Sequence, residues 1–420
     1  MQSDEEKPTV SLVINLICVN CQAEYAEGQA DVCPQCGIDE GILDVCFDLA
    51  AAGKTLTRAA LAGRSPSIWR YREVLPIDGA PPAGLEQIGW TPLIEASRLA
   101  ADLGIGRLRL KDEGRSASGS FKDRASAIGV ARALQAGAGE VACASTGNAA
   151  SSLAHCAAVV GLRANIFVSE NVPEGKLAQL LAYGARVFKV RGAYAQAYEL
   201  CTQACREFGW YNRNAAINPY LVEGKKTGGL EVAEQCAEDP PDWVVCSVGD
   251  GCSIAGVHKG LRTMKEVGVI DWSARMLGVQ AAGVAPVARA YHTGKLDRER
   301  GGETYADSIN VPVPRNWRKA VNAVRESDGT FVEATDEQIA AAVGATGRLT
   351  GIFAEPAAAT AVAGIAVARA QGILNDSSNV VAMITGSGLK DIAGALRAVG
   401  QPHEISPRIE NVVSIVEGKQ

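Results

Sequence analysis

The sequence predicts an α/β protein with two open parallel-sheet lobes and a small cysteine-bearing unit in front of them. From Arg107 onward, short β-rich runs alternate with Ala-rich helical stretches, a pattern typical of parallel sheets covered by helices on both faces. Four cysteines in two Cys-x-x-Cys pairs precede this alternation. With 420 residues, of which 47% are hydrophobic, the chain is long enough to bury a large core in two lobes.

Each expected element follows from a local pattern of apolar residues. Short runs rich in Val, Ile and Ala predict buried strands at Leu108–Lys111, Val141–Ala144, Ala164–Val168, Arg186–Val190, Trp243–Val248, Met276–Ala281 and Val380–Thr385. The stretches between them predict helices at Phe121–Ala136, Ala149–Val160, Gly175–Tyr183 and Ala193–Phe208. The segment Lys295–Arg315 carries charges, glycines and prolines, so we expect a surface excursion there.

Composition narrows the class of protein. The net charge of -6 and the pI near 5.5 argue against nucleic acid or a membrane surface as a partner. Apolar runs such as Val380–Ile384 suit buried strands and are too short to span a bilayer. The acidic first residues lack the basic segment and apolar stretch of a signal peptide. We therefore expect a cytoplasmic protein.

The cysteine cluster predicts a structural metal site. Cys18 and Cys21 form one Cys-x-x-Cys pair, Cys33 and Cys36 form the other, and eleven residues separate the pairs. Each pair can chelate one face of a tetrahedral ion. Zinc is favoured because so small a unit needs a staple, and iron in the same four-thiolate cage is the competing metal. Four thiolates leave no open coordination position, so this site would not be catalytic.

A second motif places a lysine where its chemistry can be altered. The segment 118–124, Ser-Gly-Ser-Phe-Lys-Asp-Arg, lies between a predicted strand and a predicted helix. Lys122 would then be partly desolvated beside a helix N-terminus, and both effects lower the pKa of an amine toward nucleophilic use. Taken alone, the same pattern also fits a solvated surface lysine.

Two further motifs follow predicted strands directly. Residues 145–150, Ser-Thr-Gly-Asn-Ala-Ala, offer hydroxyls and amides at a helix start, which suits a carboxylate or phosphate ligand or an ordinary helix cap. Residues 385–391, Thr-Gly-Ser-Gly-Leu-Lys-Asp, place a hydroxyl at a strand's carboxyl end, where open α/β sheets bind their ligands.

The glycine-rich loop at 247–256 predicts a cradle for a single phosphate. Glycines let the backbone wrap an anion, and the helix that follows supplies N–H donors. A Walker A loop is excluded because Val257 follows Gly256 in place of lysine. A dinucleotide fingerprint fits poorly, because after Gly249 and Gly251 the next glycine is Gly256.

Taken together and in this order, these segments resemble the threonine synthase group of the fold-type II (tryptophan synthase β-like) enzymes, which use pyridoxal phosphate (PLP). The resemblance runs from about Gly89 to Val399. It also includes the N-terminal cysteine unit, a zinc ribbon that some threonine synthases carry. It implies a PLP-dependent lyase built from two parallel-sheet lobes and a four-cysteine zinc ribbon.

The resemblance also implies a role for each motif. Lys122 is the Schiff-base lysine and later moves protons, Asn148 binds the 3'-oxygen of the cofactor, and Thr385 meets the pyridine nitrogen. Ser145 and Thr146 fall where the substrate carboxylate is held. The cofactor phosphate is cradled by the backbone of Gly249, Asp250, Gly251, Cys252 and Ser253. A neutral hydroxyl at the ring nitrogen makes a weaker electron sink, suited to elimination and replacement at the β or γ carbon.

Two positions depart from the group's pattern and leave the substrate open. An arginine is expected where Leu221 stands, to bind the phosphate of phosphohomoserine, and Asp250 occupies a position that is often Asn. Arg213, Lys225 or Lys226 could compensate. The first hypothesis is γ-elimination of phosphate and β-hydration, giving threonine from phosphohomoserine. The second is a serine/threonine dehydratase or a β-replacement synthase using serine or O-activated serine. The third is a non-catalytic PLP-binding protein or a zinc-ribbon interaction protein.

The same resemblance divides the chain into four segments and implies a homodimer. Residues 1–46 form the ribbon, and residues 47–107 form an arm and the start of the large lobe. Residues 108–228 form the small lobe with Lys122 and the carboxylate loop. Residues 229–420 form the rest of the large lobe with the phosphate cradle.

Overall fold

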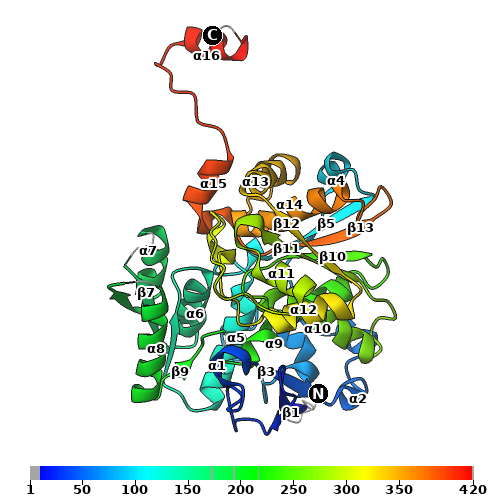
Figure 1. The fold of residues 1–420 in the computed structure, drawn as a ribbon, viewed down its shortest axis with the longest axis vertical. Coiled ribbons are helices and arrows are strands. Elements are labelled where there is room, and N and C mark those ends of the chain that lie inside the picture. Colours follow the sequence, from blue (N-terminus) through cyan, green and yellow to red (C-terminus); the bar gives the residue numbers. More distant parts are fainter. Residues whose placement is uncertain (1–9, 171, 173, 193, 216, 419–420) are drawn as a thin grey trace, which may run out of the picture.

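Three sheets organise the protein, and two of them are the expected parallel sheets. The computed structural model describes residues 10–418 except 171, 173, 193 and 216. The small lobe and the large lobe lie side by side, and the cysteine-bearing unit lies below both in Figure 1. The first residue of the predicted helix Ala193–Phe208 falls outside the described residues.

The N-terminal unit is a small antiparallel sheet in the order β2-β1-β3. It contains β1 (Val13–Cys18), β2 (Glu24–Tyr25), α1 (Gly37–Glu40) and β3 (Leu43–Phe47). Its apolar residues, such as Leu16 and Val45, share one buried cluster with residues of the small lobe. The unit is therefore docked on the lobes by a common core.

The small lobe is a parallel four-stranded sheet in the order β8-β7-β6-β9. Its strands are β6 (Glu140–Ala144), β7 (Arg163–Ser169), β8 (Arg186–Val190) and β9 (Tyr211–Asn212). Helices α5 (Lys122–Gln135), α6 (Asn148–Val159) and α7 (Glu174–Ala182) pack on one face, and α8 (Tyr194–Phe208) packs on the other. Helices on both faces are the arrangement that buried parallel strands require.

The large lobe is a six-stranded sheet in the order β12-β11-β10-β13-β5-β4. The strands are β4 (Leu93–Glu95), β5 (Arg107–Asp112), β10 (Trp243–Ser247), β11 (Arg275–Ala281), β12 (Thr330–Ala334) and β13 (Asn379–Ile384). Only the edge strand β4 pairs antiparallel. Alternate strand residues enter two separate buried clusters, one on each face, as the period of a strand dictates.

Different helices cover the two faces of the large sheet. On one face lie α4 (Ser97–Leu103), α13 (Asp336–Thr350) and α14 (Pro356–Ala370). On the other lie α10 (Cys252–Glu266), α11 (Pro286–Thr293), α12 (Trp317–Glu326) and the end of α9 (Tyr220–Gln235). The arm that follows the N-terminal unit, with α2 (Leu49–Ala52), α3 (Arg58–Ala62) and η1 (Ile68–Val74), packs on this second face.

The structure differs from the sequence-based expectation in three places. Strand β5 pairs with β13 from Arg107 to Asp112, so it belongs to the large sheet and not to the small lobe, where the range 108–228 put it. Strand β3 extends past residue 46, and its core is continuous with the small lobe. The segment 295–315 is no plain surface excursion, because Ala306 and Ile309 are buried in the large lobe.

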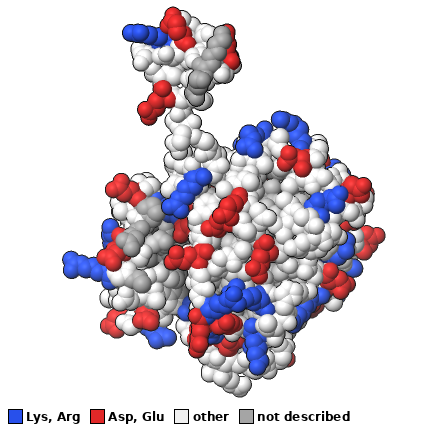
Figure 2. Space-filling model, turned by 45° about the horizontal axis from the view of Figure 1, so that its top comes forward, with Lys and Arg blue, Asp and Glu red and all other residues white. Residues whose placement is uncertain are grey.

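The C-terminal end leaves the body of the protein. After α15 (Ile392–Ala398), an extended stretch leads to α16 (Ile409–Val416), which has no buried residue and stands apart in Figure 1. Acidic and basic side chains are interspersed over the face shown in Figure 2. Among the described helices, none combines the length and apolar character needed to cross a bilayer.

Candidate active site

The predicted motifs meet at the carboxyl ends of the parallel strands. The loop with Ser145 follows β6, the glycine loop follows β10, and Thr385 follows β13. The amide of Phe121 donates to the Thr385 carbonyl at 2.9 Å, and Ser120 forms a bridge with Gly386. These contacts tie the Lys122 loop to the end of β13, the usual location of a ligand site in such sheets.

Lys122 is the first residue of α5 and is half-buried. Burial lowers the pKa of its amine, and the nearby cations Lys225 and Arg213 lower it further. The neighbouring carboxylate of Asp123 does not pair with Lys122, because it accepts hydrogen bonds from the backbone and hydroxyl of Ser118. A lysine held in this way is available as a neutral amine, the form in which it acts as a nucleophile or base.

Asn148 opens α6 and faces a buried carboxylate that the sequence analysis missed. Its side-chain amide donates to both carboxylate oxygens of Glu355, at 2.9 and 3.1 Å, and to Ser308 at 3.3 Å. Burial raises the pKa of Glu355, against the opposing effects of Asn148 and Lys122. In the sequence, Glu355 is a single acidic residue before Pro356, where the Ala-rich helix α14 begins. This isolated acid was the signal that could have indicated it.

The glycine loop forms an uncapped helix start. Gly251 takes φ of 101° as the N-cap of α10 and provides no side-chain cap. A Cβ at Gly251 would lie 2.7 Å from the Asn316 carbonyl oxygen, and one at Gly249 would lie 3.0 Å from the Ile309 Cα. The backbone N–H groups at the start of α10 therefore remain open to an anion, as the predicted phosphate cradle requires.

The carboxylate of Asp250 has a local structural role. It accepts hydrogen bonds from the backbone amide of Arg315 at 2.8 Å and from the side chain of Asn316 at 2.5 Å. These contacts fasten the glycine loop to the segment before α12. The same segment supplies Ser308 to Asn148, so it also borders the site.

The three cations considered as phosphate ligands occupy different surroundings. Lys226 donates to Glu223 at 2.5 Å and packs over the ring of Phe47, so it belongs to the docking of the N-terminal unit. Arg213 donates to the hydroxyl of Ser126 at 3.0 and 3.2 Å. Lys225 donates to the Cys252 thiol at 2.6 Å. Lys225 and Arg213 are thus the two that stay near Lys122.

The loop at residues 145–147, predicted to bind the substrate carboxylate, is held in place by the hydroxyl of Ser145. The Ser145 hydroxyl accepts from the amide of Gly147 at 3.1 Å, and the Ser145 amide donates to Phe167 on β7. Thr146 is half-exposed. Carboxylate binding by Ser145 and Thr146 remains a prediction.

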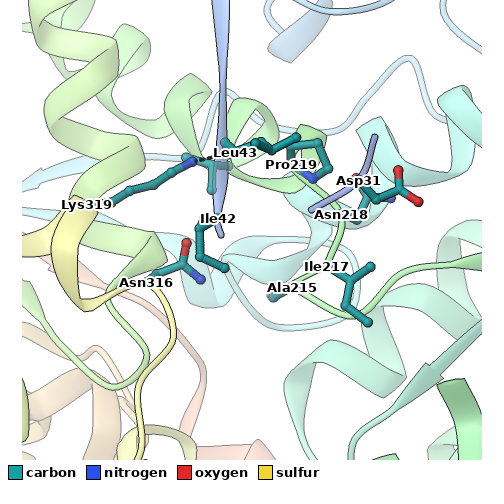
Figure 3. Close-up of a pocket in the computed structure, with 10 residues that line it drawn as sticks. Asp31, Ile42, Leu43, Ala215, Ile217, Asn218, Pro219, Asn316 and Lys319 are labelled. Carbon is teal, nitrogen blue, oxygen red and sulfur yellow. Dashed lines mark hydrogen bonds between the residues drawn. The ribbon is translucent and has the colours of Figure 1, made fainter. Parts of the chain in front are cut away.

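A pocket elsewhere on the protein has a different character. It lies between the N-terminal unit, the start of α9 and the start of α12 (Figure 3), and is lined by residues such as Ile42, Asn218 and Lys319. Lys319 donates across it to the Leu43 carbonyl at 2.7 Å. None of the predicted cofactor or substrate residues lines it, so it marks the seam where the N-terminal unit docks.

The four ribbon cysteines converge as predicted. Their sulfur atoms all lie within 4.8 Å of one another. The Cys18–Cys36 sulfur distance is 3.8 Å and the Cys21–Cys33 distance is 3.6 Å. Sulfurs bonded to a tetrahedral ion at about 2.3 Å lie roughly 3.8 Å apart, whereas a disulfide is about 2.05 Å long. The geometry therefore fits four thiolates around one metal ion.

The predicted cofactor residues also fit the group they would hold. Three buried polar atoms around the site lack a hydrogen-bond partner within the described part of the chain: the Asn148 amide oxygen and the hydroxyls of Ser120 and Ser247. Buried polar atoms are normally satisfied, so these atoms are suited to a polar ligand. With the amine of Lys122 and the open start of α10, they match an aldehyde bearing a phosphate.

The lysine with a lowered pKa, the glycine loop at the start of α10 and Thr385 at the end of β13 are arranged as expected for a two-lobed PLP enzyme. The comparisons agree: a family model described as "Pyridoxal-phosphate dependent enzyme" matches residues 85–386. The chain belongs to this family, and it is a PLP-dependent lyase of the threonine synthase type.

Relatives support the assignment over nearly the whole chain. A threonine synthase of Methanosarcina acetivorans is 37% identical over 96% of this chain and 99% of its own length. One from Methanocaldococcus jannaschii is 35% identical over 92% and 96%. A solved threonine deaminase of T.th. has a TM-score of 0.60 and 27% identity, covering 71% of this chain and 92% of that one.

Proposed function

We propose that this protein is a threonine synthase that converts phosphohomoserine and water to threonine and inorganic phosphate. The relatives named threonine synthase, which match nearly end to end, support the proposal. It is also supported by the surroundings of Lys122, which include Asn148, the glycine loop and two further cations, Lys225 and Arg213.

The observation that carries the proposal is the unbalanced positive charge around Lys122. Lys225 and Arg213, which lie near Lys122, form no ion pair with a carboxylate among the described residues. Glu355 is the acid near them, and burial raises its pKa. Buried cations need anionic partners. A cofactor phosphate together with a substrate phosphate would supply them, whereas serine or threonine would bring no phosphate.

In the proposed reaction, different residues of the chain bind the cofactor and move the protons. Bound PLP would supply the electron sink for breaking bonds at the α, β and γ carbons. The Lys122 Nζ, with its lowered pKa, takes a proton from the substrate and returns it at a neighbouring carbon. Asn148 would orient the cofactor ring, Thr385 would offer a neutral hydroxyl to the ring nitrogen, and the backbone of residues 249–253 would hold the cofactor phosphate.

Zinc is our proposal for the ribbon metal, with iron as the competing ion. The four-thiolate geometry is one that zinc prefers in structural sites. Elemental analysis of protein purified without added metal separates the two ions.

Product analysis tests the proposed reaction. With phosphohomoserine, equal amounts of inorganic phosphate and threonine should appear. Ammonia and a 2-oxo acid formed from serine or threonine, without phosphate release from phosphohomoserine, would instead identify a dehydratase. Sulfide-dependent formation of a new amino acid from O-activated serine would identify a β-replacement synthase. Either outcome would overturn the proposal.

A further inference from the structure

Helix α9 carries two adjacent buried lysines with opposite surroundings. Lys226 is paired with Glu223 at 2.5 Å. Lys225 is 1% exposed, and its hydrogen-bond partner among the described residues is the thiol of Cys252 at 2.6 Å. No carboxylate among the described residues pairs with Lys225, although a buried cation needs an anionic partner. The surroundings of Lys225 are therefore those of a residue that binds an anionic ligand.

The location of Lys225 indicates what kind of anion it would meet. Cys252 is the first residue of α10, whose N-terminus has no side-chain cap and is the predicted phosphate cradle. Lys225 also lies near enough to lower the pKa of Lys122. The amine thus lies between the cradle and Lys122, next to the place where the chemistry occurs.

Helical geometry relates Lys225 to the position where an arginine was expected. Leu221 and Lys225 are four residues, about one helical turn, apart on α9. The Cβ of Lys225 lies against Gly256 of α10, on the side of Cys252. Leu221 is fully buried near Gly129 of α5 and has no polar atom to offer.

Resting on the proposed function, we propose that Lys225 binds a phosphate monoester beside Lys122, in place of the arginine that is missing at position 221. The amine supplies a charged donor to that phosphate. We expect the phosphate of phosphohomoserine to be the ligand, and the phosphate of PLP is the other source of the same chemistry.

The other candidates are less suited to this role. Lys226 is held by Glu223, and Lys259 is held by Glu223 and Asp44. Arg213 is anchored by two hydrogen bonds to Ser126. Lys225 combines complete burial, a charge without a carboxylate partner and contact with the first residue of α10.

The test uses the holoenzyme with Lys225→Met, which keeps the length of the side chain and removes its charge. Loss of a charged contact should raise KM for phosphohomoserine or lower kcat/KM on the order of 10- to 100-fold. Lys225→Arg should recover part of the loss. Lys226→Met is the matched control on the same helix, and it should change stability without a comparable change in KM.

A second arm separates the two phosphates and keeps the proposal independent of the reaction. Binding of PLP and of pyridoxal, which lacks the phosphate, is measured for the apo forms of the wild type and of Lys225→Met. A selective loss of PLP affinity would assign Lys225 to the cofactor phosphate, whereas unchanged PLP binding with a raised KM assigns it to the substrate. Unchanged values in both arms would overturn the proposal. Wild-type protein that releases no phosphate would overturn the proposed function alone, because the PLP arm still tests Lys225.

Discussion

Two groups of buried charges lie within a few residues of each other on α5 and α9, and they are built differently. In the first group, Arg124 pairs with Glu113 at 2.8 Å and with Glu231 at 2.5 Å, and Lys111 pairs with Glu231 at 2.7 Å. All four side chains are fully buried. Two cations face two acids, so the group is neutral within the chain.

In the second group Lys225 and Arg213 lie near Lys122, and among the described residues neither of the two pairs with a carboxylate. Burial alone would raise the pKa of Glu231, but Arg124 and Lys111 hold it at about 2. Burial and the other cations instead lower the pKa of Lys122. The contrast teaches that a buried charge paired inside the chain supports the fold, whereas an unpaired one marks the place of a ligand.

The largest expected effect is at Lys122, which we propose both to hold the cofactor and to move protons. Lys122→Ala should reduce turnover on the order of 10³-fold or more and abolish the absorbance of lysine-linked PLP. Folding should be unaffected, because Lys122 forms no ion pair among the described residues. Turnover or lysine-linked absorbance that survives in this variant would point to another lysine.

Removing a charge from the first group, in which cations and acids are paired, should instead destabilise the fold. Glu231→Gln leaves Arg124 and Lys111 buried without compensation, so the free energy of unfolding should fall by about 3 to 5 kcal/mol. Denaturant titration measures this change. Glu238→Gln is the control: its pair with Arg58 is exposed, and such pairs contribute less than about 1 kcal/mol. Equal effects of the two variants would remove the distinction between the groups.

The same carboxylate predicts a pH dependence of stability. The ordinary pKa of a glutamate is 4.5, and that of Glu231 in the folded protein is about 2. Its contribution is therefore complete above pH 4.5 and is lost as the pH falls toward 2. The acid side of the stability profile should flatten in Glu231→Gln, and an unchanged slope would show that Glu231 is not the group responsible.

The cysteine ribbon is expected to be separable from the chemistry. Replacing Cys33 and Cys36 with serine should lower metal content from about one ion per chain to near zero, since two ligands of four are lost. The N-terminal unit should be destabilised, while bound PLP should largely remain because its residues lie elsewhere. Native protein without zinc or iron would contradict the metal assignment.

Substitution of Asp250 has the smallest expected effect on stability and on the use of substrate. Its carboxylate is engaged with the backbone of Arg315 and the side chain of Asn316, so Asp250→Asn should cost about 1 kcal/mol of stability. Use of phosphohomoserine should not improve, although the sequence alone suggested that removing this charge would favour a phosphorylated substrate. An improvement on the order of tenfold or more would show that the carboxylate does repel the substrate.

The sequence predicted the strands and motifs well, because strand periods and glycine-rich turns are local patterns. The four ribbon cysteines were found for the same reason. The site's partners are not local: Glu355 meets Asn148 across more than two hundred residues of chain. Likewise, no local pattern distinguishes Lys225 from Lys226, since their difference depends on Cys252 and Glu223. The sheet membership of β5 was missed because its main partner is β13, far away in the chain.

The central claim is that the unpaired positive charge beside Lys122 is there to bind phosphate. The most direct test is the unfolding free energy of the holoenzyme as inorganic phosphate is added, with chloride at equal ionic strength as the reference. A ligand at one hundred times its Kd stabilises the native state by about 2.7 kcal/mol. The account predicts this phosphate-specific stabilisation in the wild type and in Lys226→Met, and its loss in Lys225→Met. Equal stabilisation of the wild type and Lys225→Met, or no stabilisation of the wild type, would contradict it.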